Sequence, residues 1–482
     1  MKPIVFGTSG WRGPVGREVT PARMEALARA IVRWLWRRTG QANAPGGSIR
    51  VLVGRDTRLH SEWLEKTLIR ALLSHEGVSV ARGIGETPTP GVAWGVSRLP
   101  LRADLGLVVT ASHNPPSDNG LKILMPDGRL CPDPAAAEIL GLVDETPPRT
   151  RRPHPAIREV DVASAYAEAL RKLVPPPGHS LDLVVDPMHG AARKVLPAVF
   201  EGWGRVTAIR TALDPAFGGV SPDPRPETLR DLARCVVETN ADLGLAVDGD
   251  GDRFGVVDAA GACVPPHRLM PLLIEDLLLR GPRGPVARSV ATTHIVDDVA
   301  RAHRTPVVET AVGFKHLGAA MAEDGAVIAC EESGGFAWAP HVPTKDGLLA
   351  CLLVGDLVAR RGVPLHELIA DFERRFPPRP FARLDRPMDS ALLARLEEDP
   401  PTEIAGRRVE SIGRRDGLKF HLSDGSWILV RKAGTERILR WYAESRRPKD
   451  LPLILGAVDR IEAERSGGGK TRSSVSVPAM TQ

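Results

Sequence analysis

One arrangement, an apolar strand followed directly by a polar loop, occurs more than once and constrains this chain more than any other feature. Leu105–Val109 leads into residues 110–115 (TASHNP), and Leu243–Val247 leads into residues 248–253 (DGDGDR). Short, wholly apolar runs bounded by polar residues are typical of strands buried inside an α/β sheet. Ligands bind at loops that follow the carboxyl ends of such strands. The repeat therefore predicts related α/β domains whose loops face one site.

A third, weaker instance and the alternation of helices with strands extend this pattern. Residues 326–330 lead into residues 331–335 (EESGG). Apolar periodicity predicts helices from Thr20-Pro21 and at 61–74, 163–173 and 228–237, and strands at 49–53, 105–109, 181–185 and 243–247. We predict an α/β fold of three related α/β domains with mixed sheets, plus a C-terminal α+β domain, around a central cleft.

Two proline-rich runs and a polar tail divide the chain. Residues 146–153 read as an extended linker and residues 376–380 as a hinge. Beyond the hinge, Asp416-Gly417 and Asp424-Gly425 predict hairpins, and a helix is expected at about 449–465. We predict three α/β domains: residues 1–150 with the serine loop, residues 155–262 with a metal-binding loop and residues 263–376 with a sugar-binding loop. An α+β domain at residues 381–465 and a disordered tail at residues 466–482 follow.

Composition excludes several classes of protein. The 64 Lys and Arg against 59 Asp and Glu leave a net charge of only +5, too small an excess to indicate a nucleic-acid protein. Only the basic pI and the arginine-rich linker favour a nucleic-acid protein, and a charge run is usually just solvated. No apolar run approaches the roughly 20 residues of a membrane span. The five cysteines form no C-x-x-C pair. We therefore expect a cytoplasmic protein that binds neither nucleic acid nor membrane.

Residues 248–253 are the most specific motif. Asp248, Asp250 and Asp252 alternate with glycines, which lets three carboxylates turn toward one point. Carboxylates this close repel one another, and hard divalent ions prefer oxygen ligands, so Mg²⁺ is the expected cofactor. A calcium loop of the EF-hand type would need glycine and glutamate where Arg253 and Ala259 stand. The remaining alternative is a solvated acidic turn.

Ser112 lies between a buried strand and a loop rich in proline, asparagine and glycine. It is a candidate nucleophile, although a serine that caps a turn would give the same hexapeptide. No G-x-S-x-G elbow surrounds it, which argues against an ordinary α/β-hydrolase. A serine close to Mg²⁺ favours phosphoryl transfer. His113 could orient the reacting group or could merely hydrogen-bond within the turn.

Further loops carry donors suited to phosphates and sugars. Residues 7–13 (GTSGWRG) and 431–436 (RKAGTE) combine backbone N–H groups with hydroxyls and an arginine, yet each alone could be an ordinary surface turn. The loop at 331–335 offers acceptors for vicinal sugar hydroxyls, or a capped helix start. Lys315 and Lys345 add cations, and an isolated lysine is usually solvated.

Taken in order, these loops resemble the α-D-phosphohexomutase family, which includes phosphoglucomutase, phosphomannomutase and phosphoglucosamine mutase. Residues 53–58 (VGRDTR), 87–90 (TPTP), 185–190 (VDPMHG) and 214–217 (DPAF) also look like family landmarks. The resemblance spans nearly the whole chain. It implies four domains around a central cleft, the first three sharing one topology.

The resemblance also implies roles for individual residues. Ser112 would pass a phosphoryl group to the sugar phosphate, and the resulting hexose 1,6-bisphosphate would flip and return its other phosphoryl group to Ser112. Metal ligands would be Ser112, Asp248, Asp250 and Asp252. The residues beside the reacting group would be Arg12, His113, Lys122 and Lys345. Substrate would be held by Arg253, Gly313, Lys315, Glu331, Ser333, Arg431, Gly434 and Thr435.

Three positions depart from the family pattern. Ala433 stands where serine is usual, and Arg437 stands where proline is often found, so one phosphate donor is lost and one positive charge is gained. Gly335 replaces a histidine that some relatives have, which leaves Lys345 as the better candidate general acid or base.

These features predict a Mg²⁺-dependent phosphohexomutase with glucose preferred. The alternatives are a phosphomannomutase, a dual-specificity enzyme, and, in another class, a catalytically silent sugar-phosphate binding protein motivated by Ala433. The expected partners are sugar phosphates and hexose 1,6-bisphosphate. Monomer and dimer both stay open.

Overall fold

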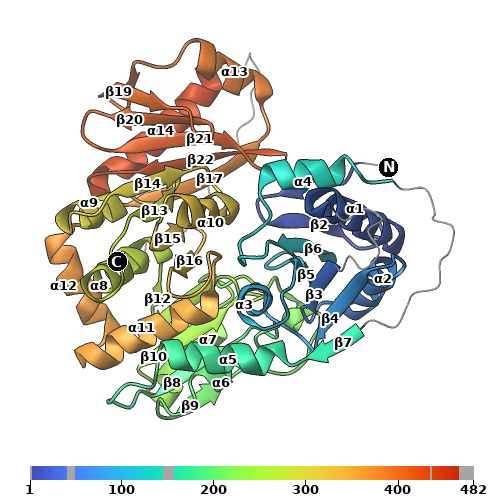
Figure 1. Ribbon diagram of the computed structural model, residues 1–482. Coiled ribbons are helices and arrows are strands. Elements are labelled where there is room, and N and C mark those ends of the chain that lie inside the picture. Colours follow the sequence, from blue (N-terminus) through green and yellow to red (C-terminus); the bar gives the residue numbers. More distant parts are fainter. Residues whose placement is uncertain (1–2, 41–48, 145–156, 435–436, 466–482) are drawn as a thin grey trace. The chain divides into compact units, whose positions relative to one another are not determined.

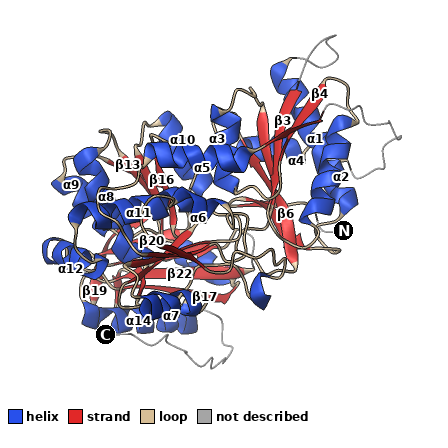
Figure 2. Ribbon diagram, turned by 90° about the horizontal axis from the view of Figure 1, so that it is seen from below, coloured by secondary structure: helices blue, strands red, loops and turns tan. Residues whose placement is uncertain are grey.

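The computed structural model describes residues 3–40, 49–144, 157–434 and 437–465. The chain divides into two compact units, Met1–Pro378 and Arg379–Gln482, and each is described by itself. Figure 1 and Figure 2 show the helices and strands of both units. The linker predicted at 146–153 and the tail predicted at 466–482 lie outside the described residues.

A seven-stranded mixed sheet opens the first unit. In spatial order its strands are β1 (Phe6–Gly7), β2 (Gly10–Pro14), β6 (Asp118–Leu124), β5 (Leu105–Val109), β3 (Ile49–Arg55), β4 (Val78–Gly83) and β7 (Ile157–Val160). The strands from β5 to β7 run parallel, and β6, β2 and β1 are antiparallel to their neighbours. One face packs on α1 (Pro21–Thr39), α2 (Ser61–Leu73) and α4 (Asp133–Leu140), and the other on α3 (Thr89–Arg98).

The first helix follows its sequence signals closely. Thr20 caps α1 by accepting a hydrogen bond of 3.3 Å from the backbone N–H of Arg23, and Pro21 occupies the first helical position. Gly40 ends the helix with a φ of 67°, a left-handed conformation that glycine adopts without steric cost. The helix predicted from Thr20-Pro21 is confirmed.

Two smaller mixed sheets follow in the first unit. The second sheet comprises β12 (Cys263–Val264), β11 (Phe254–Asp258), β10 (Leu243–Val247), β8 (Leu183–Asp186) and β9 (Val206–Ala208). The third comprises β14 (Val307–Thr310), β13 (Val286–Ser289), β15 (Ile328–Glu331) and β16 (Gly335–Trp338). Their helices are α5 (Val162–Leu173), α6 (Val195–Val199), the 3₁₀ turn η1 (Phe217–Gly219), α7 (Arg230–Thr239), α8 (Pro266–Arg280), α9 (Ile295–Ala302), α10 (Phe314–Glu323), α11 (Gly347–Arg361) and α12 (Leu365–Arg375).

All three sheets share one local plan that explains the repeat in the sequence. In each, a buried parallel strand turns back through a polar loop into an antiparallel neighbour: β5 into β6, β10 into β11 and β15 into β16. These connections are the serine loop, the acidic loop and the Glu-Glu-Ser-Gly-Gly loop. Three α/β domains with mixed sheets are therefore confirmed.

The second unit is a single antiparallel sheet with helices. Its strands, in spatial order, are β17 (Phe381–Pro387), β22 (Ile438–Glu444), β21 (Trp427–Lys432), β20 (Leu418–Leu422), β19 (Arg407–Gly413) and β18 (Glu403–Ile404). The helices are α13 (Ser390–Glu398), η2 (Pro448–Asp450) and α14 (Leu451–Arg465). Gly417 and Gly425 both have φ above 80° in the turns between strands, so both predicted hairpins are confirmed.

Membrane insertion through a helix finds no support in the described part of the chain, where every helix is too short or too polar to span a bilayer. The cysteines Cys131, Cys235, Cys263, Cys330 and Cys351 are all free thiols.

One buried polar contact joins the second and third sheets' helices. Tyr166 of α5 donates a hydrogen bond of 2.6 Å to Asp346, which in turn caps α11 by accepting one of 2.9 Å from the N–H of Leu349. Both side chains are fully buried. Burial, and the adjacent carboxylate, raise the pKa of Tyr166 well above its usual value.

We expect Tyr166→Phe to destabilise the first unit by about 1–3 kcal/mol, because it leaves a buried carboxylate without one of its donors. Urea denaturation measures the free energy of unfolding. A double-mutant cycle with Asp346→Asn supplies the control, and strictly additive losses would mean that the two side chains do not stabilise each other.

Candidate active site

The serine loop and the acidic loop meet in the first unit. Ser112 follows β5, is fully buried, and donates a hydrogen bond of 2.8 Å from Oγ to Oδ2 of Asp248, which follows β10. These two residues are 136 positions apart in the sequence. The structure therefore brings the candidate nucleophile to the predicted metal ligands.

The three aspartates of the acidic loop converge as the sequence predicted. Asp248, Asp250 and Asp252 are buried and each offers an oxygen within 4.8 Å of the others, and no other such group of ligands exists among the described residues. Burial, followed by the neighbouring carboxylates of Asp252 and Asp250, raises the pKa of Asp248 to about 8. Three buried carboxylates this close together need a cation to balance their negative charge.

The donor set fits a hard divalent ion. Oδ1 of Asp250 is buried and has no hydrogen-bond partner among the described residues, while Oδ1 of Asp252 has an ion pair of 3.3 Å with the ammonium group of Lys345. Buried carboxylate oxygens without a donor are rare in folded proteins, and oxygen ligands are those that Mg²⁺ takes. Asp248, Asp250 and Asp252 therefore fit a metal site, with Ser112 Oγ beside them.

Lys122 of β6 supplies positive charge to the same cluster. Its Nζ lies 2.5 Å from an oxygen of Asp250 and 2.5 Å from an oxygen of Asp252. The lysine is fully buried, and its pKa is nevertheless raised because the attraction of these two aspartates outweighs the loss of solvent. Lys122 thus stays charged against the acidic loop.

Arg12 and His113 lie against the serine loop. Arg12 donates 3.2 Å hydrogen bonds to Asn114 Oδ1 and to Ser9 Oγ. His113 Nδ1 is 3.3 Å from Ser112 Oγ. Burial, and then nearby cations that include Arg253, hold the pKa of His113 well below its usual value, so its imidazole is neutral at neutral pH.

The Glu-Glu-Ser-Gly-Gly loop at residues 331–335, the predicted sugar loop, lies against the acidic loop. Glu331 Oε1 accepts a hydrogen bond of 2.7 Å from Ser333 and lies 3.4 Å from Lys345 Nζ. Lys345 also reaches Oδ1 of Asp252 at 3.3 Å. An isolated antiparallel bridge pairs Arg253 with Gly335. Ser112, the acidic loop, Lys345 and the sugar loop therefore form one connected site.

Gly335 could not carry a side chain without displacing its neighbours. A Cβ at this position would lie 3.0 Å from side-chain atoms of both Glu331 and Lys345. The space that a side chain would need here is filled by the Glu331 side chain, including its carboxylate, and by the Cδ methylene of Lys345.

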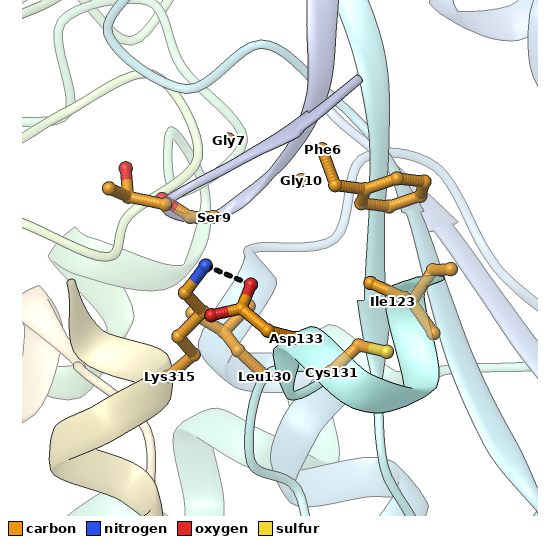
Figure 3. A pocket seen from close by; sticks show the side chains of 11 residues that line it. Phe6, Gly7, Ser9, Gly10, Ile123, Leu130, Cys131, Asp133 and Lys315 are labelled. Carbon is orange, nitrogen blue, oxygen red and sulfur yellow. Dashed lines mark hydrogen bonds and ion pairs between the residues drawn. The ribbon is translucent and has the colours of Figure 1, made fainter. Parts of the chain in front are cut away.

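Lys315 lies in a separate small pocket. Its ammonium group pairs with Asp133 beneath Ser9, as Figure 3 shows. The cavity of about 10 Å³ holds roughly one water molecule. Gly313 precedes α10 with a φ of 121°, and a Cβ there would lie 3.3 Å from Thr8.

The other predicted substrate-binding residues belong to the second unit. Arg431 pairs with Asp416 at 2.9 Å and precedes Ala433 and Gly434. Thr435 lies outside the described residues.

Sequence reasoning missed two residues that hold the site together. Thr89, at the start of α3, donates from its hydroxyl to a carboxylate oxygen of Asp250 and from its backbone N–H to the Asp250 carbonyl at 2.8 Å. Arg58 reaches the backbone of the serine loop. Both residues lie in segments that the sequence analysis used only as family landmarks. A sequence signal could have identified Arg58, because residues 53–58 also run from a buried strand into a polar loop.

Sequence-family models match all four predicted domains of this chain. Models described as phosphoglucomutase/phosphomannomutase α/β/α domains I, II and III match residues 3–149, 164–261 and 265–376. The model of the C-terminal domain of the same family matches residues 390–459.

Individual relatives cover almost the whole chain. A protein named "Probable phosphoglucosamine mutase" from Methanothermobacter thermautotrophicus is 34% identical over 94% of this chain and 96% of its own length. A "Phosphoglucomutase/phosphomannomutase" from Thermococcus kodakarensis is 30% identical over 92% and 94%. The crystal structure of a phosphoglucomutase/phosphomannomutase family protein from Burkholderia thailandensis superposes with a TM-score of 0.83 at 25% identity, covering 98% and 99% of the two chains.

Proposed function

This chain belongs to the α-D-phosphohexomutase superfamily and is a phosphohexomutase, an intramolecular phosphotransferase, and from that premise we propose that it interconverts glucose 1-phosphate and glucose 6-phosphate through a phosphoserine at Ser112. The observation that carries the proposal is the 2.8 Å contact between Ser112 Oγ and Asp248 within a buried acidic cluster. A buried hydroxyl beside a cation site is suited to phosphoryl transfer.

The chemistry requires two transfers. In the first, the bond between phosphorus and Ser112 Oγ breaks and a bond to a sugar hydroxyl forms, which gives hexose 1,6-bisphosphate. In the second, the other phosphoryl group of the turned bisphosphate returns to Ser112. We propose Lys345 as the general acid and base: its ammonium group, which lies beside Asp252 and Glu331, would give a proton to the departing oxygen and then take up the hydroxyl proton of the attacking sugar.

Mg²⁺ is the proposed cofactor, held by Asp248, Asp250, Asp252 and the Ser112 oxygen. When bound, it would neutralise negative charge on the phosphoryl group and on the three carboxylates. Arg12 and Lys122 would add positive charge beside the reacting group. In the second unit, Arg431, Gly434 and Thr435 are proposed to grip the phosphate that is not transferred. Arg253, Gly313 and Lys315 are proposed as further substrate contacts.

The sugar loop supports glucose as the preferred hexose. Glu331 and Ser333 would accept and donate hydrogen bonds to vicinal hydroxyls. Lys345 lies 3.4 Å from Glu331, so the carboxylate has a positive neighbour already and little excess charge to attract the ammonium group of glucosamine. Glucosamine phosphate is the second candidate, because relatives at 32–34% identity bear the name phosphoglucosamine mutase.

We expect turnover of glucose 1-phosphate to exceed that of mannose 1-phosphate and glucosamine 1-phosphate by at least about 10-fold in kcat/KM, a difference that one or two sugar contacts can supply. Steady-state assays of the three sugars, with Mg²⁺ and catalytic bisphosphate present, measure it. Glucosamine 1-phosphate as the best substrate would reject the glucose preference but keep the mutase chemistry.

Intact mass spectrometry of the same enzyme tests the reaction class directly. Incubation with glucose 1,6-bisphosphate should add one phosphoryl group, which peptide mapping should locate at Ser112. Sugar-phosphate binding without turnover or phosphorylation would instead favour the silent binding protein suggested by Ala433.

A further inference from the structure

The backbone that follows Ser112 folds around one buried guanidinium group. Arg58 Nη2 donates to the carbonyl oxygens of Ser112 at 2.5 Å and Asn114 at 2.7 Å. Its Nη1 donates to those of Pro115 at 2.6 Å and Asp118 at 3.0 Å. One side chain thus satisfies four carbonyl groups spread over the whole serine loop.

Ser112 has a conformation that needs such support. Its φ is 55°, in the left-handed region that a residue with a Cβ rarely adopts. Its backbone N–H donates 2.8 Å to the hydroxyl of Thr110. Strained backbone of this kind persists only where its surroundings hold it, and it often marks a functional site. Release of the strain would turn Oγ of Ser112 away from Asp248.

Arg58 is itself held from two sides. Asp56 forms an ion pair of 3.1 Å with it and also accepts 2.6 Å from the hydroxyl of Thr110. The centre of the Phe217 ring, in η1 between β9 and α7, lies 5.0 Å from the guanidinium carbon. Both charged side chains are almost completely buried. The buried positive charge is therefore compensated by a carboxylate, an aromatic face and carbonyl dipoles.

We propose that Arg58 is a positioning residue for phosphoryl transfer, which locks the Ser112 backbone in its strained conformation so that Oγ faces the acidic cluster. The inference rests on the proposed mutase function. Within the described residues, Arg58 bonds to the serine loop and to none of the three aspartates of the cluster, so it acts through Ser112. Only a planar fork of donors reaches four carbonyl groups at once, and the single ammonium group of lysine cannot.

Arg58→Lys tests the proposal because it keeps the charge and removes the fork. We expect kcat to fall by about 10²-fold, the effect of misplacing a reacting group by roughly 1 Å, while KM for glucose 1-phosphate changes by less than about 3-fold. Phosphorylation of Ser112 by glucose 1,6-bisphosphate, followed by intact mass, should slow by a similar factor.

A matched variant separates positioning from general loss of stability. Arg280, at the end of α8, is exposed but forms ion pairs with two buried carboxylates, at 2.7 Å to Asp276 and 2.7 Å to Asp356. Arg280→Lys should lower the thermal unfolding midpoint without changing kcat. Phe217→Leu keeps an apolar group against Arg58 but removes the aromatic ring. We expect it to lower kcat by a smaller factor than Arg58→Lys. If Arg58→Lys does not fold, Phe217→Leu tests the positioning role in its place.

Each outcome is decisive. A folded Arg58→Lys enzyme with wild-type kcat and phosphorylation rate would overturn the positioning role and leave the mutase function intact. An equal loss of kcat in Arg280→Lys would also overturn the positioning role. If Arg58→Lys does not fold, an unchanged kcat in Phe217→Leu would overturn it. A wild-type enzyme that neither turns over sugar phosphates nor becomes phosphorylated would overturn the proposed function, and the positioning role with it.

Discussion

Replacement of Ser112 by alanine is expected to lower hexose-phosphate turnover by more than about 10³-fold, because a covalent step cannot proceed without its nucleophile. The same variant should keep its affinity for sugar phosphates. Ser112 donates from Oγ to Asp248, whereas the residues proposed to hold the sugar, Glu331 and Ser333, bond to each other and not to that oxygen. Coupled assays measure the turnover, and calorimetry measures the binding.

Ser117→Ala is the matched control in the same loop. Ser117 is exposed, and its hydroxyl contacts only the neighbouring Asp118, at 3.3 Å, among its described partners. It should retain wild-type turnover and should still be phosphorylated at Ser112. Turnover close to the wild-type value in Ser112→Ala, or a phosphoryl group mapped elsewhere in the wild-type chain, would show that another residue carries the phosphoryl group.

The meeting of Ser112 with Asp248 was accessible from the sequence because both residues follow a buried strand. Loops in that position gather at one edge of an α/β domain, so strand periodicity and loop chemistry together were enough. The hairpins at Gly417 and Gly425 were predictable for a similar reason, since local turn chemistry decides them. Local signals therefore carried both the fold class and the acidic cluster.

What the sequence could not provide was the environment of single charged residues. Arg58, in the loop after β3, and Lys315, in the first turn of α10, are both cations, yet one is buried under four carbonyl groups and the other pairs with Asp133. Burial of a cation depends on partners that are remote in the chain, such as Phe217 for Arg58. The link between Thr89 and Asp250, 161 positions apart, was invisible for the same reason.

Removal of divalent ions should have an effect of similar size to loss of the nucleophile. The acidic cluster gathers three carboxylates within 4.8 Å of one another, and a phosphoryl group on Ser112 would bring further negative charge to Asp248. Lys122 and Lys345 contact carboxylates of the cluster, yet two positive charges do not balance three carboxylates and a phosphoryl group. We expect chelation by EDTA to lower turnover by at least about 10³-fold, with recovery when Mg²⁺ is added in excess.

Asp250→Asn separates the carboxylate's role from a general need for Mg²⁺. One oxygen of Asp250 is already engaged by Lys122 and Thr89, while Oδ1 has no partner among the described residues, so the amide should fold but bind the ion weakly. Saturating Mg²⁺ should stabilise the wild-type enzyme by about 2–3 kcal/mol at 100 times its Kd, and this variant by much less at the same concentration. Thermal unfolding with and without Mg²⁺ measures the difference independently of activity.

Asp231→Asn, at an exposed position of α7, should behave as the wild type. Equal stabilisation of all three proteins would place the ion elsewhere, because only a ligand of the folded site can link binding to stability in this way.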